Sequence, residues 1–148
     1  MSLSHASIEE SIRKREIEIS PFNASNLTPA GYDLRISEKV ELKPMEQILV
    51  ATLERVKLSL KFIAFLHLRS SFAREGLFAS LAAVDPGFDG QLTISLFNSS
   101  NKVVRISKEE PFVQLVFFKL IEEAEKGYGG KYQYSEGVVK SKRIKRFS

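Results

Sequence analysis

The chain reads VDPGFDGQLTISLFN from Val84 to Asn98, and this stretch combines two local signals. Pro86 and Gly87 form turns readily, because proline presets φ and glycine tolerates positive φ. After the turn, apolar and polar side chains alternate from Leu92 to Phe97, which is the period of a strand with one buried face. The stretch therefore predicts a β-hairpin, with the carboxylate of Asp85 at the end of a strand.

Similar short β-rich runs occupy most of the chain. They cover residues 32–36, 40–42, 48–52, 56–60, 62–68, 92–97, 103–106 and 112–120. Eight or more short strands separated by turn residues predict a closed or sandwiched sheet of the all-β class. Residues 4–15 instead have helical spacing, with Ile8 and Ile12 on one face and Ser7 and Glu10 spaced as in a capping box. Residues 17–19 then predict a short strand.

The composition is that of one globular domain. The 148 residues are 43% hydrophobic and 27% charged, and no apolar run reaches the roughly 20 residues that span a bilayer. Cysteine is absent, which excludes disulfides and thiolate chemistry. We expect a cytoplasmic protein without a membrane partner.

The net charge of +4 is concentrated at the C-terminus. The last ten residues carry five of the cations and no acid, so the rest of the chain has a net charge of −1. A short cationic terminus is typical of a solvated or subunit-docking arm, whereas nucleic-acid binding favours a basic stripe with aromatic residues. Nucleic acid is therefore an unlikely partner.

Four local sequences, in this order along the chain, resemble motifs of the dUTPase and dCTP deaminase superfamily. They are AGYDL at residues 30–34, RSSFAR at 69–74, VDPGFDG at 84–90 and PFVQL at 111–115. The resemblance implies an all-β fold, a distorted barrel or jelly roll of the β-clip type with a short N-terminal helix. Residues 1–126 would form this domain. Residues 127–148 would form a C-terminal arm, which we expect to order against a ligand or a neighbouring subunit.

The same resemblance implies a homotrimer that hydrolyses dUTP to dUMP and pyrophosphate with Mg²⁺. Asp85 matches the aspartate that activates the attacking water, and Asp33 matches the residue linked to Mg²⁺ through water. Uracil would be read by the backbone near residues 81–84. The expected substrate contacts are Arg69, Ser70, Ser71, Arg74, Phe88, Thr93, Ser95, Gln114, Tyr128 and Lys131.

The residue types of these contacts suit a nucleoside triphosphate. Arg69 and Arg74 offer guanidinium groups that match phosphate oxygens, and the adjacent serines add hydroxyl donors. The alternative for this segment is a solvated turn with a surface ion pair. Gln114 lies in an apolar strand, so its amide needs a partner if it faces inward, and a phosphate or an adjacent subunit would serve. Phe88 lies where the motif packs an aromatic ring beneath the deoxyribose.

Ser95 separates the two activities of the superfamily. At the matching position deaminases carry a glutamate that shuttles protons during attack on cytosine, and a serine hydroxyl is too weak a base near neutrality. No carboxylate occurs between Asp89 and Glu109 to replace it. The lid sequence GYGGKYQ at residues 127–133 resembles deaminases, with Ser135 in place of a further glutamine. Three alternatives stay open: a dCTP deaminase using another carboxylate, a non-catalytic nucleotide-binding trimer, and a β-sandwich interaction module.

Overall fold

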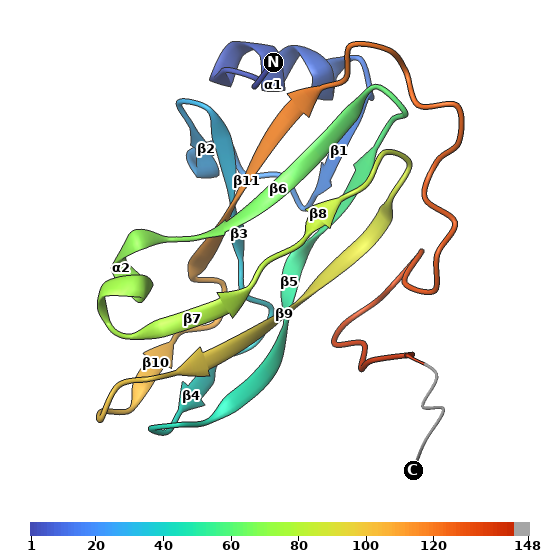
Figure 1. The fold of residues 1–148 in the computed structure, drawn as a ribbon. Helices are drawn as coiled ribbons and strands as arrows, with labels where there is room; N and C mark the ends of the chain where they lie inside the picture. Colours follow the sequence, from blue (N-terminus) through green and yellow to red (C-terminus); the bar gives the residue numbers. More distant parts are fainter. Residues whose placement is uncertain (144–148) are drawn as a thin grey trace.

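A computed structural model describes residues 1–143 of the chain (Figure 1). Its helical elements are α1 (His5–Arg13), the 3-10 turn η1 (Ala24–Asn26) and α2 (Ser70–Arg74). Its strands are β1 (Ile17–Ser20), β2 (Leu27–Thr28), β3 (Gly31–Arg35), β4 (Val40–Leu42), β5 (Gln47–Leu58), β6 (Phe62–Leu68), β7 (Leu77–Ser80), β8 (Ala83–Val84), β9 (Asp89–Asn98), β10 (Val104–Ile106) and β11 (Pro111–Lys119). The predicted all-β class is confirmed.

The strands form three sheets within the described part of the chain. One has the order β1-β5-β9-β7, another β2-β3-β11-β6-β8, and β10 pairs with β4. The sheets do not join into one closed barrel. Alternate residues of the two larger sheets, such as Ile94 on β9 and Leu115 on β11, belong to one hydrophobic core. Burying each such side chain contributes about 1.5–3 kcal/mol.

Two local predictions need correction. The helix begins one turn earlier than the expected capping box, because the Ser4 side chain caps it and accepts from the Ser7 backbone N–H. The runs predicted at residues 48–52 and 56–60 are one strand, β5, with a bulge. Ala51 pairs with Thr93 and Arg55 with Gln91, so β5 has two more residues than β9 in this interval. A bulge bends a strand without ending it, which is why the pattern resembles two strands.

The segment around residues 69–74 forms a short helix that the sequence pattern did not predict. Arg69 precedes α2, and Gly76, with φ of +94°, ends the turn after it. A Cβ on Gly76 would lie 2.9 Å from the Ser100 Cβ, so a larger residue does not fit there. The chain then forms β7, which the sequence did not predict, and β8, the strand expected before Asp85. The predicted hairpin is wrong, because β8 pairs with β6 while β9 pairs with β5 and β7, so residues 85–88 form a turn that connects two sheets.

Residues 127–143 contain no helix or strand and lie along the protomer's own β9 (Figure 1). Backbone hydrogen bonds join Tyr128 N to Pro86 O, Tyr134 N to Asp89 O and Gln91 N to Ser135 O, at 2.7, 2.7 and 2.8 Å. The arm was expected to order only against a ligand or neighbour, but its own strand supplies the partners. Of the basic tail, Lys145 and Arg146 lie outside the described residues. No helix within residues 1–143 is long and apolar enough to cross a bilayer.

Candidate active site

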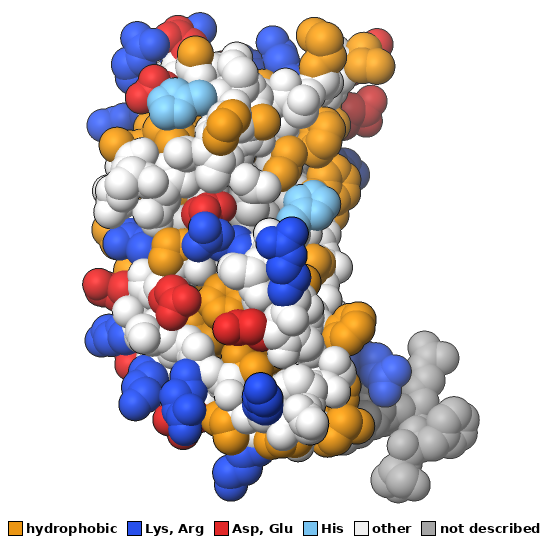
Figure 2. All heavy atoms as spheres, turned by 90° about the vertical axis from the view of Figure 1, so that its left-hand side faces the viewer, with side chains coloured by type: hydrophobic (Ala, Val, Ile, Leu, Met, Phe, Trp, Pro, Cys, Tyr) orange, Lys and Arg blue, Asp and Glu red, His pale blue; other side chains and the backbone are white. Residues whose placement is uncertain are grey.

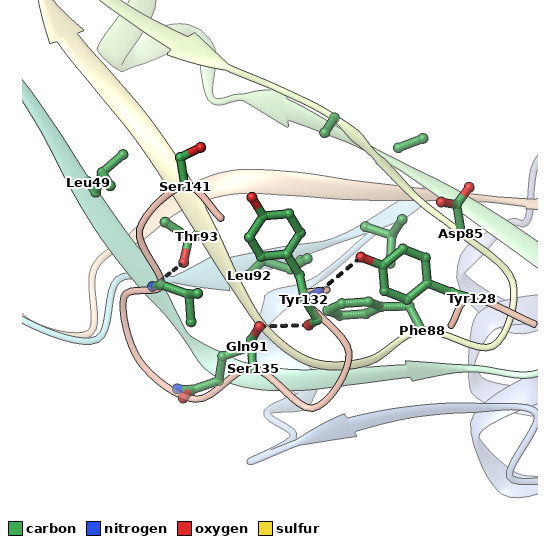
Figure 3. Close-up of a pocket in the computed structure, with 14 residues that line it drawn as sticks. Leu49, Asp85, Phe88, Gln91, Leu92, Thr93, Tyr128, Tyr132, Ser135 and Ser141 are labelled. Carbon is green, nitrogen blue, oxygen red and sulfur yellow. Dashed lines mark hydrogen bonds between the residues drawn. The ribbon is translucent and has the colours of Figure 1, made fainter. Parts of the chain in front are cut away.

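A pocket of about 380 Å³ lies between β9, the turn that connects β8 to β9 and the C-terminal arm (Figure 3). Four of the predicted site residues line it: Asp85, Phe88, Thr93 and Tyr128. Ala82, Ala83 and Val84, from the segment expected to face the base, line it as well. Its size is within the range of small-molecule sites.

Asp85 is exposed and is the one carboxylate among the residues that line this pocket. Within the described chain its side chain makes no hydrogen bond, while its backbone C=O accepts from the Phe88 N–H at 3.1 Å and closes the turn. Gly87 adopts φ of +81°, and a Cβ there would lie 2.7 Å from the Gly127 Cα. The turn therefore needs glycine both for its backbone angle and for its contact with the arm.

Aromatic rings form the apolar wall beside Asp85. Phe88 is buried, and its ring meets that of Tyr128 edge to face, with 5.7 Å between centroids and 61° between planes. Tyr132 lies farther along the pocket, and its backbone N–H donates to the Tyr128 hydroxyl at 3.2 Å (Figure 3). A flat ligand ring can pack on such a wall while its edge meets the polar groups.

The arm is fixed by Gln133 to the turn before β9. Its Oε1 accepts from Asp89 N at 2.8 Å, and its Nε2 donates to Gly87 O at 2.8 Å and to Tyr128 O at 3.0 Å. Asp89 itself pairs with Arg55, with 2.6 Å between Oδ1 and Nε, and this hydrogen bond raises the pKa of Arg55. The turn and the first half of the arm are thus one hydrogen-bonded unit.

Thr93 and Ser95 occupy the same outward face of β9, two residues apart. The Thr93 hydroxyl accepts from Val139 N at 3.0 Å, so it holds the arm as well as lining the pocket. Ser95 is not among the pocket-lining residues, and its hydroxyl is 2.8 Å from Gln47 Nε2, which donates to it. The position of Ser95 outside the pocket therefore gives no support to its predicted contact with substrate.

The predicted phosphate ligands form a second group away from this pocket. Arg69 Nε lies 3.3 Å from Asp33 Oδ2, and Arg69 also donates to Pro111 O at 3.3 Å. Gln114 pairs with Asp33 across β11 and β3, and its amide donates to Thr28 Oγ1 at 2.9 Å. The partner that Gln114 was expected to find in a phosphate or neighbouring subunit is therefore a threonine of the same protomer.

Burial raises the pKa of Asp33, and the positive charge of Arg69 opposes this shift only in part. A carboxylate that is partly desolvated and incompletely compensated is frequent at functional sites. On α2, Ser70, Ser71 and Arg74 are exposed. Figure 2 shows the face of the molecule on this side, where acidic and basic side chains are interspersed among polar ones.

The two groups lie at opposite edges of the protomer, with α2 at the left of Figure 1 and the arm at the right. Lys131 belongs to the arm, where its Nζ donates to Lys142 O at 3.2 Å and Lys142 Nζ donates to Lys131 O at 2.9 Å. One protomer therefore brings Asp85, Phe88, Thr93 and Tyr128 together, but it does not bring them to the residues of α2.

The described residues contain no cluster of three or more carboxylate or imidazole groups able to hold a metal ion. Asp33 offers one carboxylate, already paired with Arg69. This donor set does not fit a resident metal. It suits a hydrogen bond to water on a Mg²⁺ that arrives bound to phosphate, because Mg²⁺ retains several waters and takes few protein ligands.

Several pocket residues escaped sequence reasoning. They are Leu49, Gln91, Leu92, Tyr132, Ser135, Val139 and Ser141. Alternation along β9 could have found Gln91, because it lies on the same face as Thr93. The arm residues carried no such signal, because the arm has no regular period.

Comparison with known proteins gives the following relatives. The dCTP deaminase-like protein family matches residues 37–120. The dCTP deaminase of Pyrococcus horikoshii is 44% identical, over 89% of this chain and 94% of its own length. A probable deoxyuridine 5'-triphosphate nucleotidohydrolase of Sulfolobus islandicus rod-shaped virus 1 is 38% identical, over 96% and 99%. A dUMP-forming dCTP deaminase of Aquifex aeolicus is 32% identical, over 96% and 94%. The relatives thus include enzymes of both activities.

Solved structures of phage dUTPases share the fold. That of Staphylococcus bacteriophage 80alpha superposes with a TM-score of 0.60 at 21% identity, over 77% of this chain and 96% of its own. That of phage phi11 of Staphylococcus aureus, which coordinates a structural Mg(II) ion, gives 0.61 at 19%, over 77% and 97%. At this identity the likeness concerns the architecture alone.

Proposed function

Because the chain belongs to the dCTP deaminase-like family of the dUTPase and dCTP deaminase superfamily, we propose that it is the dUTP-hydrolysing kind of member. It would convert dUTP and water to dUMP and pyrophosphate. The observation that carries the choice is the pair Asp85 and Ser95. Asp85, which would activate the water, lines the pocket, while Ser95, at the position that matches the deaminase glutamate, has a hydroxyl bonded to Gln47.

The chemistry assigned to Asp85 is general-base catalysis. Its carboxylate accepts a proton from the water as the water oxygen attacks the α-phosphorus. The bond from that phosphorus to the α–β bridging oxygen breaks, and pyrophosphate leaves with the electron pair. The turn at residues 85–88 supports this role, because it holds the carboxylate at the pocket while the carboxylate oxygens make no hydrogen bond within residues 1–143.

Base and sugar would occupy the pocket beside the turn at residues 85–88. Phe88 would pack under the deoxyribose, and backbone groups of residues 82–84 would bond the edge of uracil. The dimensions support this assignment, because about 380 Å³ suits a nucleoside and Phe88 with Tyr128 forms a flat apolar wall. Lys131, on the arm, would approach the phosphates when the nucleotide is bound.

The phosphates would be held by α2 of a neighbouring protomer in a homotrimer. α2 lies at the opposite edge of the protomer from the C-terminal arm that borders the pocket (Figure 1), which supports a site in which a second chain supplies Arg69, Ser70, Ser71 and Arg74. An apolar surface supports assembly. Phe65, 38% exposed, meets Phe118 edge to face at 5.6 Å on the outward face of β6 and β11, where Ile63 and Val116 also lie. An exposed apolar face of a sheet is typical of a protein–protein interface.

Magnesium would arrive as part of the substrate, coordinated by triphosphate oxygens. The ion would neutralise phosphate charge and orient the triphosphate of the substrate for in-line displacement. Asp33 and Gln114 would bond the phosphates or the waters of the ion, after displacement of Arg69 or Thr28 from their present contacts.

One experiment tests the function. The purified protein is incubated with Mg²⁺ and each deoxynucleoside triphosphate in turn, and every product is identified by chromatography. We expect dUMP and pyrophosphate from dUTP. Ammonia release from dCTP would support a deaminase, the second candidate, which the 44% identity to a dCTP deaminase favours. Tight binding without product would indicate a regulatory trimer, and the absence of any nucleotide-dependent rise in Tm would indicate an interaction module.

A further inference from the structure

Gln91 has an unusual set of partners for a side chain that borders a pocket. Its Nε2 donates to Thr52 O at 2.9 Å and to Leu53 O at 3.3 Å, and its Oε1 accepts from Gly137 N at 2.6 Å. Its backbone N–H donates to Ser135 O at 2.8 Å. One residue of β9 thus joins the interior strand β5 to the C-terminal arm.

The bulge in β5 fixes the orientation of this amide. Thr52 and Leu53 lie between the two paired positions of β5, where their carbonyls face Gln91 instead of the β9 backbone. A carbonyl accepts but cannot donate, so the NH₂ group must face the bulge and the oxygen must face the arm. The acceptor for Gly137 is therefore set in place before the arm arrives.

The bulge is itself held by a buried ion pair. Glu54 is fully buried, and its carboxylate accepts from Arg35 N at 2.9 Å and from Arg35 Nε at 2.6 Å. Thr52 Oγ1 donates to Glu54 O at 2.8 Å and accepts from Leu92 N at 3.0 Å. A carboxylate satisfied in this way resists rearrangement, because removing one partner leaves a buried charge unpaired.

Beyond Ser135, the arm bonds to β9 side chains where a neighbouring strand would bond to the β9 backbone. Gly137 N and Val139 N, two residues apart, donate to the side-chain oxygens of Gln91 and Thr93, also two residues apart. The arm therefore has a fixed register on β9, and this register carries Ser135 and Val139 into the pocket wall.

We propose that Gln91 is a positioning residue that latches the C-terminal arm over the pocket, with Thr93 as the second anchor. Both oxygens are occupied by the arm when it is closed, so they hold the lid and do not read the base. Base recognition then falls to the backbone of residues 82–84 and to the arm. The latch follows from the contacts alone, and only its catalytic consequence rests on the proposed function.

Hydrogen–deuterium exchange of the full chain, without nucleotide, tests the latch directly. Gln91→Ala should lower the protection factors of the segment 135–139 by about fivefold to tenfold, the effect of losing one or two hydrogen bonds. Gln47→Ala is the matched control, because it removes an amide-to-hydroxyl contact on the same sheet that does not touch the arm. Unchanged protection of 135–139 in a folded Gln91→Ala protein would overturn the proposal.

Gln91→Glu separates the bond that the side chain accepts from the arm from the bonds that it donates to the bulge carbonyls. An ionised glutamate can accept from Gly137 but is repelled by the bulge carbonyls, so arm protection should be low at pH 7. It should recover at mildly acidic pH, when the protonated group can again donate. Thr93→Val removes the second anchor without touching the bulge, and it should also loosen the segment 135–139 if Gln91→Ala disturbs the sheet. A pH-independent Gln91→Glu protein with wild-type protection would contradict the latch.

Kinetics gives a second readout. If part of the binding free energy of the substrate is used to close the arm, a weaker latch leaves less of it for affinity. Gln91→Ala should then raise the KM for dUTP by about fivefold to tenfold with kcat nearly unchanged. Equal losses in kcat and kcat/KM would assign Gln91 to the chemistry and contradict a latch. A wild-type protein that forms no dUMP yet shows the expected exchange pattern would refute the proposed function and leave the latch standing.

Discussion

Arg69 and Asp33 form an ion pair, with 3.3 Å between Nε and Oδ2, that leaves the carboxylate incompletely compensated. Burial raises the pKa of Asp33 even though the guanidinium opposes the shift. The folded protomer therefore holds a proton on Asp33 more tightly than the unfolded chain does, and ionisation of this carboxyl costs stability.

The first prediction concerns the dependence of stability on pH. Because the pKa of Asp33 is higher in the folded state, its contribution to stability falls as pH rises from about 4 through the raised value. Asp33→Asn should therefore raise Tm at neutral pH, and the difference should vanish in acid. Thermal unfolding of both proteins from pH 3 to pH 7 measures this. A variant less stable than the wild type at pH 7 would show that the ion pair outweighs burial.

The second prediction concerns the general base. Asp85→Asn should lower kcat for dUTP hydrolysis by about a hundredfold to ten-thousandfold, the usual range for a lost general base. Binding of a non-hydrolysable dUTP analogue should be nearly unchanged, because the amide keeps the shape of the carboxylate. Tm should also be kept, since no side-chain hydrogen bond of Asp85 exists within residues 1–143. Unchanged turnover would remove Asp85 from the mechanism.

The third prediction concerns the choice of activity. Ser95→Glu places a carboxylate on the outward face of β9, two residues beyond Thr93, where deaminases carry their glutamate. We expect detectable ammonia release from dCTP in this variant and none in Ser95→Gln, which has similar size but cannot shuttle protons. An enzyme-coupled ammonia assay measures both. Ammonia release by the unaltered protein would show that a different carboxylate performs deamination.

The fourth prediction concerns the division of the site. Asp85→Asn and Arg69→Ala proteins should each be nearly inactive, but after mixing and subunit exchange about a quarter of the sites would combine one intact pocket with one intact α2. Activity should recover to about that fraction of the wild type. Mixing Asp85→Asn with Phe88→Ala is the control, because both changes affect the same pocket. No recovery in the first mixture would place the whole site in one protomer.

The regular elements followed from sequence wherever burial alternates. The predicted boundaries of β4 and β6 agree with the structure, because turn residues flank each run. The alternation of apolar and polar residues did not predict the structure where tertiary contacts determine the backbone conformation. The bulge between Ala51 and Arg55 depends on the buried pair of Glu54 with Arg35, and nothing in the local sequence indicates that pairing.

The candidate site shows the same limit. The motif resemblance of residues 84–90 singled out Asp85 and Phe88, and the turn brings both residues to one pocket. Gln133 was not predicted, because its role depends on meeting Gly87 and Asp89, more than forty residues earlier. The sequence also could not show that α2 lies across the protomer from the C-terminal arm, because the fold alone produces that separation (Figure 1).

The separation of α2 from the pocket has a consequence for dilute protein. If catalysis needs both faces, a lone chain has no complete site, and specific activity becomes a property of concentration. It should hold steady while assemblies persist and fall steeply once subunits dissociate, with nucleotide delaying the loss by bridging two chains. Turnover per chain would then require a protein concentration above the one at which the subunits dissociate.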